Sequence, residues 1–161
     1  MRLTQWTDYS LRVLMYCAQC ETRQMGATIQ EIADRHDISK SHLTKIVMTL
    51  AGAGYLQTTR GRGGGIRLGR PSSEIRVGDV VRKTETDFVI VECFDQSSSS
   101  CALMPSCRLK KVFSDALNAF YEQLDQITLA DLMVDTTVLH QVIRLPVSKL
   151  KKTKTRTTGY S

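Results

Sequence analysis

The chain has 161 residues, 42% of them hydrophobic, and a formal net charge of +6. That length suffices for one compact domain with an additional arm. No apolar run approaches the roughly 18 residues that a membrane span needs, and the first residues lack the apolar region of a secretory signal. We therefore expect a cytoplasmic protein that associates with no membrane.

The charge is unevenly distributed along the chain. Residues 2–70 hold ten basic and five acidic side chains, residues 71–143 hold six and eleven, and residues 144–161 hold six basic and no acidic ones. A basic N-terminal part favours a polyanionic partner, most often nucleic acid. The acidic middle segment argues against DNA lying along that part of the chain.

Three helices are predicted in the first third. The first spans residues 7–22 and is capped by Thr7 or Asp8. The sequence Thr28-Ile29-Gln30-Glu31 is a capping box that opens the second helix, and the turn after it places Asp37 where a left-handed backbone is needed. Ser39 caps the third helix, which stops at residues 52–54.

The second and third helices have the spacing of a helix-turn-helix. Leu43 and Ile46 face inward, whereas the outward side chains of the third helix are short, polar or basic. Such side chains can reach base edges and phosphates in a major groove, although a plain helical hairpin shares the pattern. The candidate DNA-binding residues here are Thr28, Ser39, Lys40, Ser41, His42, Thr44 and Lys45.

A basic hairpin follows directly. Residues 55–59 and 65–69 are predicted strands, joined by the glycine-rich loop R-G-R-G-G. Four arginines, at positions 60, 62, 67 and 70, flank three consecutive glycines, and such a tip can lie on a phosphate backbone. We therefore predict a mainly α-helical winged helix-turn-helix with a small β-hairpin. The wing adds Arg60, Arg62, Gly63, Gly64 and Arg67 to the candidate DNA contacts.

The second half contains one long helical pattern, over residues 108–124. Its apolar face is broader than one small domain can bury, which predicts a homodimer built on this helix. Shorter elements are a helix over residues 77–83, an extended segment over 88–93, a turn at 96–100 and a helical turn at 128–132. The basic tail beyond Pro146 is predicted to be disordered.

Cysteines supply the candidate metal ligands. Their odd number, five, speaks against a disulfide framework. Cys93, Cys101 and Cys107 are spaced C-x7-C-x5-C in a serine-rich segment, and converging thiolates suit an iron–sulfur cluster or a zinc ion. Three free cysteines in a loop remain the alternative. Cys17 and Cys20 lie near the end of the first helix, where core packing is expected rather than redox chemistry.

Four motifs occur in order along the chain. They are L-T-Q-W-T-D-Y-S-L-R-V-L-M-Y, the wing T-T-R-G-R-G-G-G-I-R-L, P-S-S-E-I-R-V-G-D-V-V, and V-E-C-F-D with Cys101 and Cys107. With these motifs the sequence resembles the IscR/NsrR/RirA group of bacterial winged-helix regulators that carry iron–sulfur clusters. The resemblance covers residues 1 to about 134.

The resemblance implies a ligand set. Members of the IscR type place a histidine three residues after the last cysteine, where this chain has Lys110. Members of the NsrR type use an aspartate at the start of the first helix, contributed by the partner subunit, and Asp8 matches it. Cys93, Cys101, Cys107 and the other subunit's Asp8 are then the ligands of a 4Fe-4S cluster, with 2Fe-2S as the alternative.

The function implied is a transcriptional repressor that binds a palindromic operator in double-stranded DNA and releases it when nitric oxide reacts with the cluster. An iron-responsive repressor of the RirA type is the alternative, followed by a zinc-stabilised DNA-binding module and then by an electron-transfer enzyme. The predicted division is a winged-helix domain (residues 1–83), a cluster-binding loop (84–107), a dimerisation helix with its following turn (108–134) and a basic tail (135–161).

Overall fold

The computed structural model describes residues 2–61, 63–86, 91, 94 and 107–133. Its helices and strands run in the order α1 (Gln5–Gln19), α2 (Ile29–His36), α3 (Lys40–Gly52), β1 (Leu56–Thr59), β2 (Gly65–Leu68), η1 (Ser72–Glu74), α4 (Val77–Thr84), α5 (Arg108–Asp125) and η3 (Asp131–Met133). We call the part from α1 to α4, with its hairpin, the winged-helix unit. The predicted fold class is confirmed.

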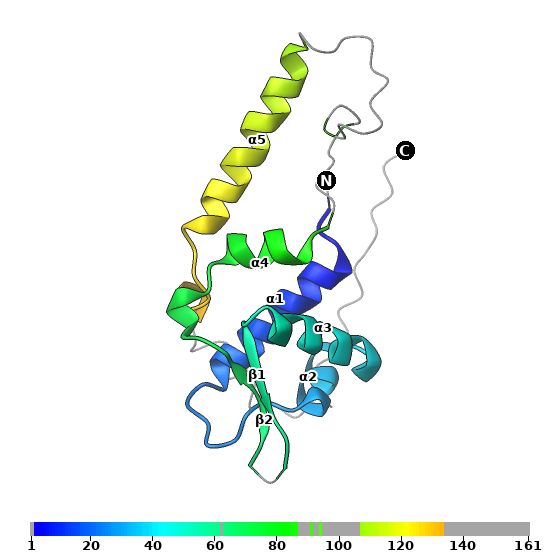
Figure 1. Cartoon of the computed structure of the whole chain (residues 1–161), viewed down its shortest axis with the longest axis vertical. Helices are drawn as coiled ribbons and strands as arrows, with labels where there is room; N and C mark the ends of the chain where they lie inside the picture. Colours follow the sequence, from blue (N-terminus) through cyan, green and yellow to red (C-terminus); the bar gives the residue numbers. More distant parts are fainter. Residues whose placement is uncertain (1, 62, 87–90, 92–93, 95–106, 134–161) are drawn as a thin grey trace, which may run out of the picture.

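Helix α1 is the centre of the winged-helix unit, in contact with α2, α3, α4 and β2. The hairpin projects from one end of the molecule and α5 extends at the other (Figure 1). The core between the helices holds fully buried aliphatic side chains, among them Leu14, Ile32, Leu43, Ile46 and Val80. No helix in the described part of the chain is long and apolar enough to cross a membrane.

The local signals around the helix-turn-helix form as predicted. Thr28 and Glu31 make a reciprocal capping box at the start of α2. Asp37 adopts the left-handed conformation with φ 54°, and the Ser39 hydroxyl accepts a hydrogen bond from the His42 backbone N–H. These contacts satisfy helix N–H groups that would otherwise lack partners, so the bounds of both helices follow from the sequence.

The prediction for the start of α1 is wrong. The helix runs from Gln5 to Gln19 and its N-cap is Thr4, whose hydroxyl accepts from the Thr7 backbone N–H. Thr7 does not cap the helix because its side chain is buried and donates to the Thr84 hydroxyl at 2.9 Å. Asp8 lies within the first helical turn, where a negative charge interacts favourably with the helix dipole.

The wing is an antiparallel hairpin in which Leu56 pairs with Leu68 and Thr59 with Gly65. Ile66 is its buried residue on β2, and Ala27 extends the ladder by donating to the Ile66 carbonyl at 2.9 Å. At the tip, a Cβ on Gly64 would overlap the Thr59 carbonyl oxygen. A glycine is therefore required at position 64 for the loop to close.

The helices of the second half are also confirmed, as α4, α5 and the 3-10 turn η3. After α5 the chain returns to the winged-helix unit, where Leu129 is fully buried and its N–H donates to the Ile75 carbonyl at 2.9 Å. The predicted extended segment at 88–93 (apart from Val91), the turn at 96–100 and the tail from residue 135 lie outside the described residues.

Candidate nucleic-acid interface and metal ligands

One face of α3 carries the polar side chains expected to meet DNA. Lys40, Ser41, Thr44 and Lys45 are exposed on it. The opposite face is buried in the core through Leu43, Ile46, Val47 and Leu50. Thr44 donates its hydroxyl to the Lys40 carbonyl at 2.8 Å, whereas both lysines are exposed.

His42 does not simply face DNA or solvent, as the sequence suggested. Its ring lies 5.7 Å from the Trp6 ring and 5.3 Å from the Tyr9 ring, centroid to centroid, and the residue is half-buried. Such tilted and edge-on contacts between rings are stabilising. The start of α1 is therefore packed against the first turn of α3.

Trp6 and Tyr9 are residues that sequence reasoning missed. Together with Ser41, His42 and Lys45, Trp6 lines a surface hollow of about 370 Å³ beside the start of α3. The signal available in the sequence was the spacing of Trp6 and Tyr9, three residues apart on one helix face, close to a helix predicted to bind DNA.

Ser39 and Thr28, two of the candidate DNA contacts, are the N-caps of α3 and α2. Each side chain accepts a hydrogen bond from the backbone at the start of its helix, and the helix end carries a partial positive charge. Backbone N–H groups at such ends are suited to phosphate oxygens. Both residues are exposed.

The arginines of the wing have different environments. Arg60 is exposed at the end of β1, next to the glycine tip where Gly63 has φ 78°. Arg67 donates to the Arg23 carbonyl at 3.2 Å and to the Gln24 carbonyl, so it ties β2 to the loop between α1 and α2. Arg70 lies 4.5 Å from the centre of the Tyr55 ring. Arg62 lies outside the described residues.

Two of the four predicted metal ligands are described. Cys107 is half-buried at the N-cap of α5 as a free thiol, and its side chain makes no capping hydrogen bond. Asp8 is 46% exposed and pairs with Arg12 through both carboxylate oxygens, at 3.0 and 2.8 Å. Thiolates and carboxylates are ligands of iron in proteins, so the chemistry of both residues fits an iron–sulfur cluster. Cys93 and Cys101 lie outside the described residues.

Cys17 and Cys20 have the packing role expected of them. Both belong to the hydrophobic core and are at most 4% exposed. Burial raises the pKa of the Cys17 thiol to about 12, which keeps it protonated at neutral pH. A protonated, buried thiol is a poor metal ligand and a poor nucleophile.

Comparisons with known proteins agree with this architecture. The family model described as "Rrf2: Iron-dependent Transcriptional regulator" matches residues 3–135. The chain therefore belongs to the Rrf2 family. It is 46% identical to the transcriptional regulator NsrR of Bacillus subtilis over 90% of this chain and 99% of that protein, and 44% identical to NsrR of Bacillus licheniformis over 89% and 99%.

Solved structures of other proteins resemble this fold as well. The IscR structure from T. potens matches with a TM-score of 0.69 and 25% identity, covering 86% of this chain and 90% of that one. The oxidised form of CymR from Staphylococcus aureus matches with a TM-score of 0.66 and 26% identity, over 83% and 97%. This Rrf2 chain is thus a DNA-binding transcriptional regulator and not an enzyme.

Proposed function

We propose that this Rrf2 protein is a homodimeric repressor that holds an iron–sulfur cluster and releases its operator in response to nitric oxide. Near full-length similarity to NsrR regulators, at 39–46% identity, carries the proposal. The described residues support it through the exposed basic face of α3, the Cys107 thiol and the Asp8 carboxylate.

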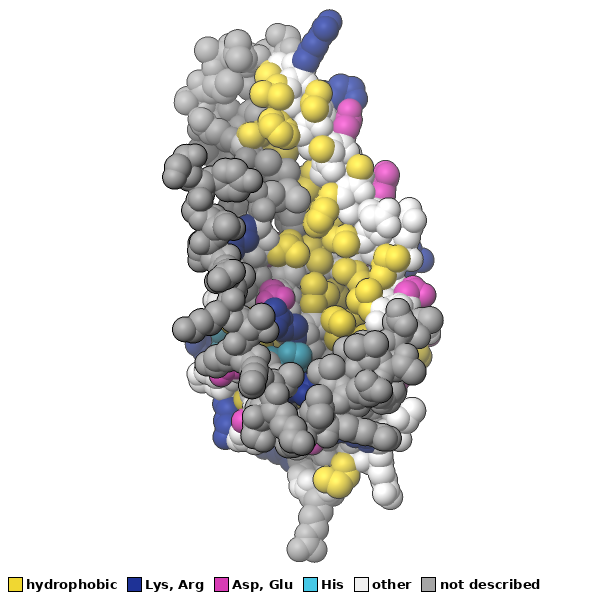
Figure 2. All heavy atoms as spheres, turned by 180° about the vertical axis from the view of Figure 1, so that it is seen from behind, with side chains coloured by type: hydrophobic (Ala, Val, Ile, Leu, Met, Phe, Trp, Pro, Cys, Tyr) yellow, Lys and Arg dark blue, Asp and Glu magenta, His cyan; other side chains and the backbone are white. Residues whose placement is uncertain are grey.

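Dimerisation is supported by the surface of α5. Hydrophobic side chains form a band along this helix (Figure 2), and Leu109 and Val112 are 58% and 59% exposed. No described residue of α5 is fully buried. Water-exposed apolar area of this extent on one helix favours burial against a second copy. Val112→Glu should produce a monomer by sedimentation, whereas Lys111→Ala, at the neighbouring position, should remain dimeric.

Two winged-helix units in a dimer would read a palindrome with half-sites about 34 Å apart. In each unit the polar face of α3 would enter the major groove, and the wing would lie on the backbone through Arg60 and its glycine tip. Arg62 and Arg67 remain predicted contacts, the latter in addition to its hydrogen bonds within the wing. Within the basic tail, residues 149–161 would add only non-specific affinity.

The proposed cluster would be held by Cys93, Cys101 and Cys107 of one subunit and by Asp8 of the other. When bound, it would supply iron that reacts with nitric oxide, and a 4Fe-4S form is expected. Asp8 would be the hard ligand in a soft set, and its carboxylate pairs with Arg12. The Arg12 guanidinium, which pairs with both carboxylate oxygens, would orient Asp8 as the oxygen ligand of the group.

Stepwise addition of nitric oxide to the anaerobically purified, cluster-loaded protein on operator DNA tests the signal. The proposal predicts that DNA is released as the visible absorption of the cluster collapses. DNA that stays bound after that collapse contradicts nitric-oxide control. Release that follows iron chelation and ignores nitric oxide instead supports the iron-responsive alternative.

A matched pair of cysteine variants tests the ligands. Cys107→Ser should lose the cluster, whereas Cys17→Ser should retain it, because Cys17 is a core residue. Iron and sulfide analysis is the measurement. A colourless protein that contains zinc instead of iron and sulfide would support the alternative of a zinc-stabilised DNA-binding module.

A further inference from the structure

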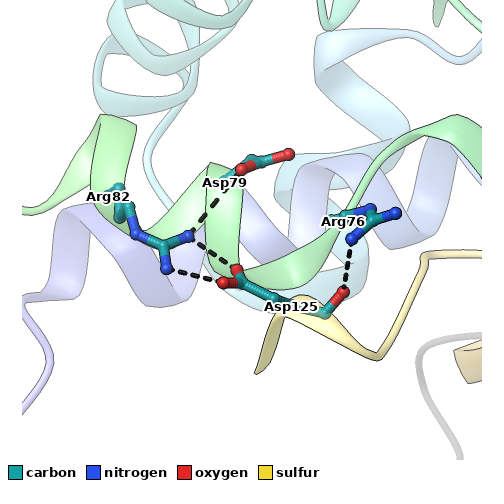
Figure 3. Close-up of polar contacts among 4 residues, drawn as sticks. All are labelled: Arg76, Asp79, Arg82 and Asp125. Carbon is teal, nitrogen blue, oxygen red and sulfur yellow. Dashed lines mark hydrogen bonds and ion pairs between the residues drawn. The ribbon is translucent and has the colours of Figure 1, made fainter. Parts of the chain in front are cut away.

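The contact between α4 and α5 is formed by a group of polar side chains. Arg82 on α4 donates two parallel hydrogen bonds to the Asp125 carboxylate, from Nη1 to Oδ1 at 2.6 Å and from Nη2 to Oδ2 at 2.7 Å. Asp79 lies 3.8 Å from the same guanidinium, and Arg76 donates to the Asp125 carbonyl at 3.3 Å (Figure 3). We call these four residues and Tyr121 the α4–α5 junction.

Arg82 is held by two successive turns of α5. Its guanidinium lies 4.3 Å from the centre of the Tyr121 ring, one turn before Asp125, and such a cation–π contact is attractive. On the α4 side, a Cβ on Gly78 would overlap the Asp125 carboxylate. The absence of a side chain at position 78 therefore lets the carboxylate lie directly against α4.

Among the described residues, the chain that follows Asp125 is attached to the winged-helix unit. Past Asp125, the Ile127 carbonyl accepts from the Val77 N–H at 2.9 Å, and Leu129 is buried in the winged-helix unit. Along α5 itself no described residue is fully buried. Within the part of the chain that the structure describes, the contacts that direct α5 away from the unit therefore lie at its C-terminal end.

This direction has a geometric consequence for DNA binding. Helix α5 has 18 residues and is about 27 Å long. A tilt of about 10° at the junction moves its far end by about 5 Å on that length, which exceeds the rise of about 3.4 Å between base pairs. In a dimer formed through α5, such a tilt also changes the distance between the two copies of α3.

The junction contributes more to geometry than to stability. Arg82 and Asp125 are 41% and 32% exposed, and ion pairs that remain in contact with water add little to the free energy of unfolding. A bidentate arginine–carboxylate pair does, however, fix relative orientation, because its two parallel hydrogen bonds allow little rotation.

We propose that the Arg82–Asp125 pair sets the angle between α5 and the winged-helix unit and thereby selects the spacing of the half-sites that the dimer accepts. The ring of Tyr121 and the lack of a side chain at Gly78 support the pair in this position. This inference rests on the proposed dimerisation through α5. Arg82 and Asp125 are thus positioning residues for operator recognition that touch no base.

The experiment uses the full-length, cluster-loaded protein. Its DNA is a palindromic duplex, with two-fold symmetry, that the wild-type protein selects from a random pool of sequences. Two further duplexes carry one base pair inserted or deleted between the half-sites. The measured quantity is the ratio of affinities for the selected duplex and each altered duplex. We expect a ratio above tenfold for the wild type and below threefold for Arg82→Gln and Asp125→Asn.

Two further variants make the result specific. Arg82→Lys keeps the charge but loses the two-pronged geometry, so it should fold normally and still lower the ratio. Asp115→Asn removes the exposed pair with Lys111 elsewhere on α5 and should retain the wild-type ratio. Thermal unfolding of each variant should show little change.

The outcomes separate this inference from the proposed function. Wild-type ratios in Arg82→Lys and Asp125→Asn overturn the inference and leave dimeric operator binding intact. A wild-type protein that binds no two-fold duplex better than random DNA overturns dimeric recognition, and the inference with it. A parallel loss of affinity for all three duplexes, with the ratio unchanged, would assign the junction a purely structural role.

Discussion

Replacing Lys45 by alanine tests whether the exposed face of α3 meets the DNA backbone. Lys45 is exposed one helical turn after Ser41, on the rim of the hollow formed with Trp6 and His42. Its aliphatic stem has no place in the core, so its loss should leave the free energy of unfolding nearly unchanged. The change should appear in DNA binding alone.

The size of the effect follows from counterion release. Each phosphate neutralised by a lysine adds about 0.9 to the slope of log affinity against log salt concentration. A dimer carries Lys45 twice, so Lys45→Ala should reduce the slope by about 1.8. Between 50 and 200 mM salt, a fourfold change, the affinity advantage of the wild type over the variant should then shrink by about twelvefold.

Fluorescence anisotropy of operator DNA at several salt concentrations measures this slope. Lys111→Ala is the matched control, because Lys111 is also exposed but lies on α5 and pairs with Asp115 at 2.8 Å. The control should keep the wild-type slope. Identical slopes for Lys45→Ala and the wild type would refute the docking of α3 onto phosphates, whatever the change in affinity at a single salt concentration.

Three further predictions concern the elements that present this surface. Gly64→Ala should distort the wing and weaken DNA binding, since its Cβ would overlap the Thr59 carbonyl, whereas Gly52→Ala has free space at the end of α3 and should bind normally; gel-shift titration compares them, and equal binding would contradict the close approach at the tip. Leu129→Ala should cost about 2–5 kcal/mol of unfolding free energy, because the side chain is fully buried, and Leu132→Ala, 37% exposed, far less; urea denaturation decides, and similar costs would exclude a core role. Burial, together with the charges of Arg12 and Arg35, lowers the pKa of His36 below its ordinary 6.5, so the unfolded chain takes up a proton first and the stability should fall as pH decreases below about 6.5; His36→Gln should flatten this dependence, and an unaltered pH profile would count against it.

Features set by neighbours in the sequence were predictable. The capping box of Thr28 and Glu31, the left-handed Asp37 and the Ser39 cap each depend on contacts within four residues, so composition and spacing suffice. The buried positions of α3 follow in the same way from its helical period.

Features set by distant contacts were not predictable. Thr7 was expected as a cap, but its hydroxyl is used by Thr84, 77 residues away. His42 was expected to face outward, yet the packing of α1 on α3 places it against Trp6 and Tyr9. Arg82 and Asp125 are 43 residues apart. Their pairing depends on how the chain returns to the winged-helix unit after α5. The periodicity of hydrophobic residues does not reveal this path.

Two of these distant contacts, those of Thr7 and His42, involve α1. Its first two turns carry Asp8, and the same turns pack on α3 through the rings of Trp6 and Tyr9. Its N-cap is tied to the end of α4, because the backbone N–H of Thr4 donates to the buried Glu85 carboxylate at 2.6 Å. Close-packed interiors do not deform continuously, so a displacement of α1 at Asp8 has to be accommodated at both contacts. Asp8, the proposed oxygen ligand of the cluster, thus lies on a helix that contacts both α3 and the end of α4.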